Sequence, residues 1–82
     1  MMAEQRPVVM PSVEVGMEEG RVVEFLVEVG SWVARGQPLF VVEADKVTIE
    51  IDAPVEGRVA ELCAEPDTDV RVGSPVLVLD VG

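Results

Sequence analysis

Lys46 is the residue whose chemistry stands out, because it is the only lysine in the 82-residue chain and the other five basic side chains are arginines. Histidine is absent and Cys63 is the single cysteine. A His-based catalytic triad, a usual zinc or haem ligand set and an internal disulfide are therefore excluded. Two explanations remain open for Lys46: an arginine-biased composition that leaves one lysine on a solvated turn, or a single amine presented for modification.

A lysine that performs catalysis itself is a third explanation, and the surrounding charges argue against it. Such a lysine needs burial or neighbouring cations to become a nucleophile at neutral pH. The neighbours of Lys46 by sequence or expected pairing are Glu43, Asp45 and Glu50, which favour the charged ammonium form. We therefore expect that a separate enzyme with an activated acyl donor is required to modify this amine.

Length and charge limit what kind of protein can carry this lysine. Eighty-two residues make one small domain, and a net charge of −10 repels phosphate backbones and anionic lipid headgroups. Apolar residues alternate with charges, Gly and Pro, so no run approaches the roughly 20 residues that cross a bilayer. The first residues resemble neither a signal peptide nor a transit peptide. We expect a soluble domain that binds neither nucleic acid nor membrane and stays in the compartment where it is made.

Valine dominates the elements that must position Lys46. The chain has 19 Val and two Ile, against 11 Leu and Ala together, and β-branched residues favour strands. Six prolines and seven glycines interrupt the chain too often for a long helix. We expect about eight short strands. Their approximate positions are Val8–Met10, Arg21–Val27, Ser31–Val33, Leu39–Glu43, Val47–Asp52, Arg58–Ala64, Thr68–Val70 and Val76–Val81.

An internal repeat with an offset of 37 residues runs through the chain. Nine of the 24 positions from Gly20 to Glu43 are identical to the positions 37 residues later, including aligned Gly36 with Gly73 and Pro38 with Pro75. A fixed offset is hard to produce by composition alone. Two similar halves that bury their apolar faces against one another predict an all-β, quasi-twofold sandwich or flattened barrel.

The repeat places Lys46 at a hairpin tip, because residues 44–47 connect the two halves. If Asp45 and Lys46 are the central turn residues, one face of the hairpin is apolar and the other is mixed. Asp tolerates the positive φ of a two-residue loop better than Lys does, so another turn type or a longer loop remains open. The expected core pairs are Val42 with Ile49 and Phe40 with Ile51, and the outward pairs are Val41 with Glu50 and Leu39 with Asp52.

Several other residues have plainer structural explanations. Trp32 and Phe40 are expected to supply much of the bulk of a valine-built core. Cys63 is expected to be buried or half-buried, and no basic neighbour is evident that would activate its thiol. The segment 67–69 (Asp-Thr-Asp) lacks the further ligands of a calcium loop and is interpreted as a turn equivalent to residues 30–32.

The segment Glu43-Ala44-Asp45-Lys46-Val47 resembles the lipoyl-lysine motif of lipoyl domains, the carrier modules of dihydrolipoamide acyltransferase (E2) components of 2-oxo acid dehydrogenase complexes. The likeness runs from about residue 7 to residue 81. It implies lipoic acid in amide linkage to Lys46, with Glu43, Asp45, Gly30 and Gly57 in recognition by the lipoylating enzymes. Further matching segments are Met10-Pro11, Met17–Gly20, Val29-Gly30, Val33, Gly36, Pro38-Leu39 and Ala53–Gly57.

The resemblance also implies fold and partners. The fold is a flattened barrel of two four-stranded antiparallel sheets with quasi-twofold symmetry and the lipoyl-lysine on a hairpin tip. The lipoamide is reductively acylated by the E1 2-oxo acid dehydrogenase, carries the acyl group to the E2 catalytic core and is reoxidised by E3, dihydrolipoamide dehydrogenase. The lipoylating enzymes are a lipoate–protein ligase, or an octanoyl transferase with lipoyl synthase. A short flexible tether raises the effective concentration to about millimolar, and the module itself is non-catalytic.

The resemblance further predicts a lipoyl domain over residues 7–81 with a flexible N-terminus over residues 1–6. The domain is expected to be the N-terminal module of a longer E2 chain, monomeric in isolation, and cytoplasmic in a bacterium or in the mitochondrial matrix in a eukaryote.

Three alternatives stay open. Biotinyl carrier domains share the architecture, but they have methionines on both sides of the modified lysine, where this chain has Asp45 and Val47. The glycine-cleavage H-protein is lipoylated but longer. An unmodified β-sandwich that acts only as a binding module belongs to a different functional class.

Overall fold

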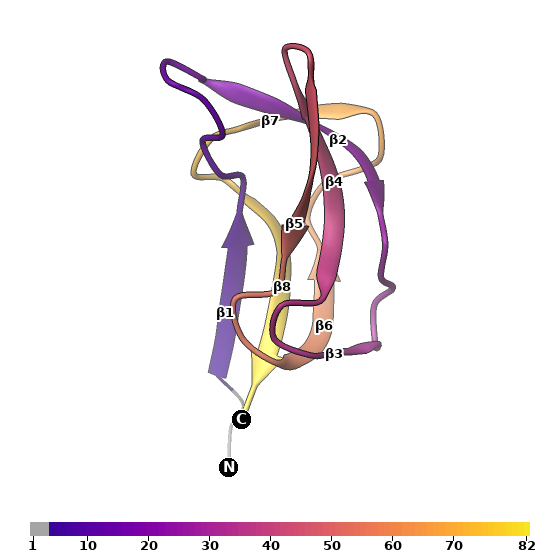
Figure 1. The fold of residues 1–82 in the computed structure, drawn as a ribbon. Coiled ribbons are helices and arrows are strands. Elements are labelled where there is room, and N and C mark those ends of the chain that lie inside the picture. Colours follow the sequence, from indigo (N-terminus) through magenta and orange to yellow (C-terminus); the bar gives the residue numbers. More distant parts are fainter. Residues whose placement is uncertain (1–3) are drawn as a thin grey trace.

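The protein is an all-β sandwich in the computed structural model, which describes residues 4–82. Two four-stranded antiparallel sheets have the strand orders β1-β8-β6-β3 and β5-β4-β2-β7, and the Cα atoms span 42 × 21 × 19 Å (Figure 1). The predicted fold class is confirmed. The strands are β1 Glu4–Val9, β2 Glu19–Phe25, β3 Trp32–Val33, β4 Pro38–Ala44, β5 Val47–Asp52, β6 Gly57–Leu62, β7 Thr68–Arg71 and β8 Pro75–Val81.

The two halves of the repeat are interleaved, so neither half forms a sheet alone. The repeat makes β2 equivalent to β6, β3 to β7 and β4 to β8, and the order of the strands along the chain makes β1 equivalent to β5. When each strand of the order β1-β8-β6-β3 is replaced by its equivalent, the result is β5-β4-β2-β7, which is the order of the other sheet. Each sheet therefore combines two strands from residues 4–44 with two from residues 47–81. This exchange gives both halves a shared core and fixes the quasi-twofold relation.

The turns repeat with the same offset as the sequence. Gly36 and Gly73 both have positive φ, at 86° and 92°. Gly30 has φ 93°, and its equivalent Asp67 has φ 64° although it is not a glycine. The backbone N–H groups of Gly30 and Asp67 each donate over 2.7 Å to a strand carbonyl, of Val59 and Val22 respectively. The 67–69 segment is thus a turn, as predicted, and no cluster of metal-ligating side chains occurs within residues 4–82.

The core lies between the sheets and is built mainly from valine and leucine. Phe40 is fully buried, as predicted, and its ring is 6.1 Å from that of Phe25. Trp32 is 57% exposed, so its predicted place in the core is wrong. Successive strand residues face opposite sides, and Val33 takes the inward position of the two-residue strand β3. The buried apolar residues are Val8, Met10, Val22, Val27, Val33, Leu39, Phe40, Val42, Ala44, Ala53, Val59, Val76, Leu77 and Leu79.

A β-bulge changes the predicted position of Leu39. The register shifts between Pro38 and Phe40, so that Pro38 rather than Leu39 lies opposite Asp52. Leu39 is fully buried, whereas the regular alternation predicted that it faces outward. One extra residue in a strand reverses the facing of the residues beyond it. The equivalent residue Val76 lies at the corresponding shift in β8 and is also fully buried.

The two ends of the strand assignment also differ from expectation. Strand β1 begins at Glu4 rather than at Val8, and Glu4, Gln5 and Arg6, which were expected in a flexible N-terminus, lie opposite β8 residues. Residues 1–3 of that predicted terminus are outside the described part of the chain.

Cys63 follows the end of β6 and is exposed, contrary to its predicted burial. Across residues 4–82, no helix has the length and apolar character needed to cross a membrane.

Candidate functional site

The β4–β5 hairpin projects Lys46 from one end of the sandwich (Figure 1). Its cross-strand pairs Val42–Ile49, Phe40–Ile51 and Val41–Glu50 confirm the predicted register. Ala44 pairs with Val47, so Asp45 and Lys46 are the two central residues of the turn. Only Asp45 has positive φ, at 54°. The short polar side chain of Asp tolerates this conformation, which spares Lys46 from it.

The Lys46 side chain is exposed and free to react with an external enzyme. The ion pairs found within residues 4–82 join Arg6 to Glu4 and Arg21 to Asp67, and neither involves Lys46. The flanking residues Asp45 and Val47 are also exposed, whereas Ala44 is buried beneath the turn. A primary amine exposed to solvent at the tip of a paired hairpin is accessible for acceptance of an acyl group.

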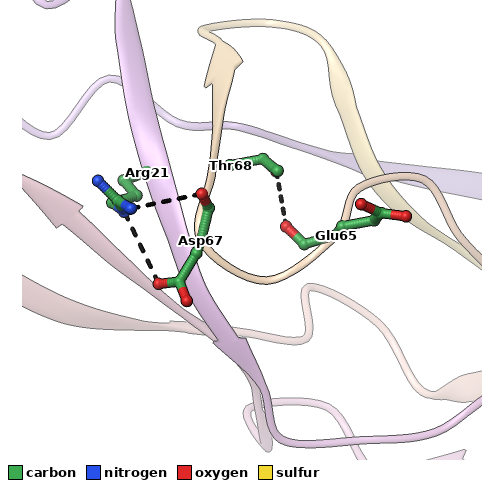
Figure 2. A network of polar contacts seen from close by, with 4 residues as sticks. All are labelled: Arg21, Glu65, Asp67 and Thr68. Atoms are coloured by element: carbon green, nitrogen blue, oxygen red, sulfur yellow. Dashed lines mark hydrogen bonds and ion pairs between the residues drawn. The ribbon is translucent and has the colours of Figure 1, made fainter.

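Glu43 lies beside this tip with its side chain exposed. Its Cα partners are Thr48 on β5 and Arg21 on β2. The Arg21 guanidinium is held elsewhere, because it lies 3.8 Å from the Asp67 carboxylate and donates to the Asp67 carbonyl over 3.4 Å (Figure 2). Within the described residues the Glu43 carboxylate therefore remains without an ion pair. The structure brings Glu43, Asp45 and Lys46 together on one hairpin.

The loop after β1 lies at the same end of the molecule as the hairpin (Figure 1). Met17 packs against the core from this loop, and its sulfur accepts a hydrogen bond from the Val13 N–H. A Cβ on Gly20 would lie 2.7 Å from the Met17 methyl and 2.8 Å from the Met10 sulfur. A larger residue at position 20 would therefore have to displace the ends of these two methionine side chains, a contact that the place of Gly20 in the repeat did not indicate.

Gly30 and Gly57 do not lie beside Lys46. Gly57 is the first residue of β6 and Gly30 precedes β3, in the sheet that does not contain the hairpin. Strand β3 and the start of β6 lie at the opposite end of the molecule from the hairpin tip (Figure 1). Gly57 is buried, and a Cβ there would lie 2.5 Å from the Asp80 carbonyl oxygen. Gly30 has positive φ and open space around it. Both glycines have structural reasons for their type, and their predicted part in enzyme recognition stays a prediction.

Cys63 offers no second reactive centre. Although Cys63 is exposed, partial desolvation by its neighbours raises the pKa of its thiol, and the nearby Glu61 carboxylate raises it further. A raised pKa keeps the thiol protonated, and the thiolate is the nucleophilic form. The hairpin amine is therefore the reactive group that the structure displays.

The sequence and this geometry place the protein in a known family of carriers. A family model described as "Biotin-requiring enzyme", of the biotin/lipoyl type, matches residues 6–79. The chain belongs to this biotin/lipoyl attachment family.

Two relatives and two solved structures describe the chain's place in that family. It is 43% identical over 67 residues to the dihydrolipoyllysine-residue acetyltransferase component of the pyruvate dehydrogenase complex of Mycoplasma capricolum, a match that covers 82% of this chain and 15% of the relative. It is 36% identical over 72 residues to the lipoamide acyltransferase component of the branched-chain alpha-keto acid dehydrogenase complex of Pseudomonas putida, covering 88% of this chain and 17% of the relative. The chain thus spans less than a fifth of these relatives.

The solved structures confirm the fold and include a lipoyl domain and a carboxylase. The lipoyl domain of the 2-oxoglutarate dehydrogenase complex of Azotobacter vinelandii superposes with a TM-score of 0.74 at 23% identity, over 93% of this chain and 98% of that one. A single-chain, multi-domain long-chain acyl-CoA carboxylase superposes with a TM-score of 0.80 at 26% identity, over 95% of this chain and 7% of that one. The shared fold alone therefore does not separate lipoyl from biotinyl carriers.

Proposed function

We propose that the protein is a lipoyl carrier domain in which lipoic acid is attached through an amide to Nζ of Lys46. The observation that carries the proposal is the single lysine of the chain, exposed at the tip of the β4–β5 hairpin. The domain makes and breaks no bonds by itself. Its part is to present one amine to the attaching enzyme and to carry the attached group between active sites.

Attachment requires little of the domain beyond access. Lys46 gives up a proton and its Nζ attacks the activated acyl carbon, so that an amide forms as the activating group leaves. Because the amine is exposed at the turn of a paired hairpin, the attaching enzyme can reach it without unfolding the tip. When attached, the dithiolane of lipoate supplies the redox-active, acyl-accepting chemistry. Asp45, Val47 and the unpaired Glu43 are the residues of this chain that surround the acceptor, and we assign recognition by the attaching enzyme to Glu43 and Asp45.

The flanks of Lys46 favour lipoate over biotin. Biotinyl carriers resemble this fold but have methionine on each side of the target lysine, and this chain has Asp45 and Val47 there. The two relatives described above are lipoyl-type acyltransferase components by name. We therefore propose that the partners are those of a 2-oxo acid dehydrogenase complex: the E1 dehydrogenase, the E2 catalytic core and the E3 dihydrolipoamide dehydrogenase.

Intact mass spectrometry tests the proposed modification. The purified chain is incubated with lipoate–protein ligase, ATP and lipoate, and a parallel sample receives biotin ligase, ATP and biotin. A lipoyl-sized mass gain in the first sample only is the expected result. Lys46→Arg keeps the charge but removes the primary amine, and is expected to gain no mass.

Other results would point to other functions. A gain only with biotin ligase would identify a biotinyl carrier, and no gain with either enzyme from a folded chain would favour a pure binding module. The E1 partner is tested by adding the lipoylated chain to purified E1 enzymes with their 2-oxo acids. Acylation of the domain by one E1, with no acylation of Lys46→Arg, is the expected outcome.

A further inference from the structure

A hollow of about 450 Å³ is lined mainly by residues of the connection between β2 and β3. This connection leads away from the hairpin tip (Figure 1). Three of the exposed large apolar side chains of the described chain belong to residues 25–33. Leu26 is 41% exposed and Trp32 is 57% exposed, and both line the hollow. Apolar side chains that gather around a concavity with a polar rim are a feature of interaction sites. The residues that line the hollow are Phe25, Leu26, Val27, Glu28, Ser31, Trp32 and Gln37.

The polar groups of the hollow select its ligand. Glu28 is the one charged side chain among the lining residues. Within residues 4–82, neither its carboxylate nor the indole N–H of Trp32 has a hydrogen-bond or ion-pair partner. The Gln37 side-chain oxygen accepts a hydrogen bond of 3.1 Å from the Ala34 N–H, which holds this side chain in place. The hollow thus combines an exposed tryptophan side chain with an unpaired carboxylate.

We infer that this hollow binds an arginine side chain of a partner protein. A guanidinium is planar, stacks on an indole face and donates a fork of hydrogen bonds to a carboxylate, which matches Trp32 beside Glu28. The aliphatic stem of that arginine and an adjacent apolar residue of the partner would cover Leu26. A partner bound here leaves Lys46 free, because the residues that line the hollow do not include the β4–β5 hairpin tip, and the β2–β3 connection leads away from that tip (Figure 1).

The cationic neighbours of the hollow do not fill it. Arg58 is the Cα partner of Trp32, but its guanidinium donates to the Gly30 carbonyl over 2.7 Å. Arg35 is exposed on the turn after β3 and has no ion pair within the described chain. The internal repeat supplies a matched control, because Glu65 is the equivalent of Glu28 while Asp69 stands at the position of Trp32.

The test uses the unmodified chain, so it is independent of the proposed modification of Lys46. The probe is the tripeptide acetyl-Leu-Arg-Leu-amide, with lysine and citrulline versions for comparison. Trp32 is the only tryptophan, so its single indole signal in a ¹H–¹⁵N NMR titration reports binding at this hollow. Saturable shifts of this signal are expected, with Kd lowest for the arginine peptide.

The variants decide between a built site and diffuse attraction to an acidic surface. Glu28→Gln is expected to raise Kd by about fivefold, the upper range for one exposed ion pair, whereas Glu65→Gln leaves it unchanged. Equal Kd values for the arginine and citrulline peptides, shifts that do not saturate, or equal effects of the two variants would overturn the inference. The Trp32→Ala variant lacks the indole signal, so the backbone amide signal of Ser31 reports binding there. This variant is expected to show no saturable shift.

Discussion

Lys46 owes its accessibility to its neighbour in the turn rather than to a polar contact of its own. Asp45 takes the positive φ of 54°, and Lys46 follows it with its side chain exposed. The glycines that accompany the lysine in the sequence have a different origin. At Gly57 a backbone carbonyl oxygen leaves no space for a Cβ, and at Gly30 the φ of 93° favours glycine over other residues. The reactive residue Lys46 and the glycines that the scaffold needs therefore lie at separate ends of the domain.

Substitution of the two glycines distinguishes a structural from a recognition role. Gly57→Ala is expected to lower the free energy of unfolding by about 3 kcal/mol, because its Cβ meets the Asp80 carbonyl, which is fixed in β8. Gly30→Ala meets no atom within 4 Å and is expected to lose about 1 to 2 kcal/mol from its φ alone. Urea unfolding measures both values.

The recognition role is checked on the same proteins. If the structural explanation suffices, folded Gly30→Ala is lipoylated at the wild-type rate. A folded Gly30→Ala chain that the ligase modifies slowly would show that the enzyme reads this turn.

The Cys63 thiol gives a prediction for pH dependence. Partial desolvation and Glu61 raise its pKa, so the pH midpoint of alkylation by iodoacetamide is expected above that of a cysteine in a short peptide. Glu61→Gln removes the smaller cause and lowers the midpoint only part of the way. Glu65→Gln, a charge change farther along the same connection, serves as the control and leaves it unchanged. A wild-type midpoint at or below the peptide value would contradict the expected direction.

The β4–β5 hairpin fixes which residue is presented. Two consecutive turn residues have different backbone conformations, so they project their side chains differently. Exchange of the pair, Asp45→Lys with Lys46→Asp, keeps composition and net charge while it moves the amine by one residue. We expect lipoylation by the ligase to slow by about 100-fold, since a small misplacement of a reacting group has an effect of that order.

The hairpin prediction depends on a folded double variant. Circular dichroism checks the fold, and single-turnover mass spectrometry compares the modification rates. Lipoylation of the folded double variant at the wild-type rate would mean that the enzyme needs only an exposed amine, wherever the turn places it.

The sequence predicted the elements better than their irregularities. Alternation of apolar residues around Asp45 and Lys46 fixes the hairpin register, because a slip by one residue would expose the whole apolar face. The bulge at Leu39 was missed, since an extra residue in a strand leaves no mark in composition. The size of Trp32 suggested a place in the core, but Val33 takes the inward position of the two-residue strand β3 and alternation turns Trp32 outward.

Symmetry was visible in the sequence, but the exchange of strands was not. The offset of 37 residues predicts that the halves have equivalent turns, and Gly30 and Asp67 confirm it with φ 93° and 64°. It does not determine whether each half forms its own sheet, because both arrangements bury the same apolar faces. The exposed position of Lys46 at the junction could be predicted because the repeat itself ends there.

The whole domain has a charge of −10 and only two ion pairs within residues 4–82, so its folded state is expected to repel itself electrostatically. Sodium chloride screens such repulsion, with a Debye length of about 10 Å at 0.1 M. Raising the salt concentration at pH 7 is expected to increase Tm by about 5 °C, which corresponds to about 1 kcal/mol for a domain of this size. Calorimetry measures the change.

Acylation of Lys46 removes one positive charge and takes the net charge from −10 to −11. The lipoylated domain and Lys46→Gln should therefore both have a lower Tm than wild type at low salt, and the difference should disappear at high salt because screening removes its cause. Lys46→Arg keeps the charge and should follow wild type throughout. A difference that persists at high salt, or a Lys46→Arg chain that behaves like Lys46→Gln, would show that the amine contributes through local contacts of the hairpin rather than through the charge of the whole molecule.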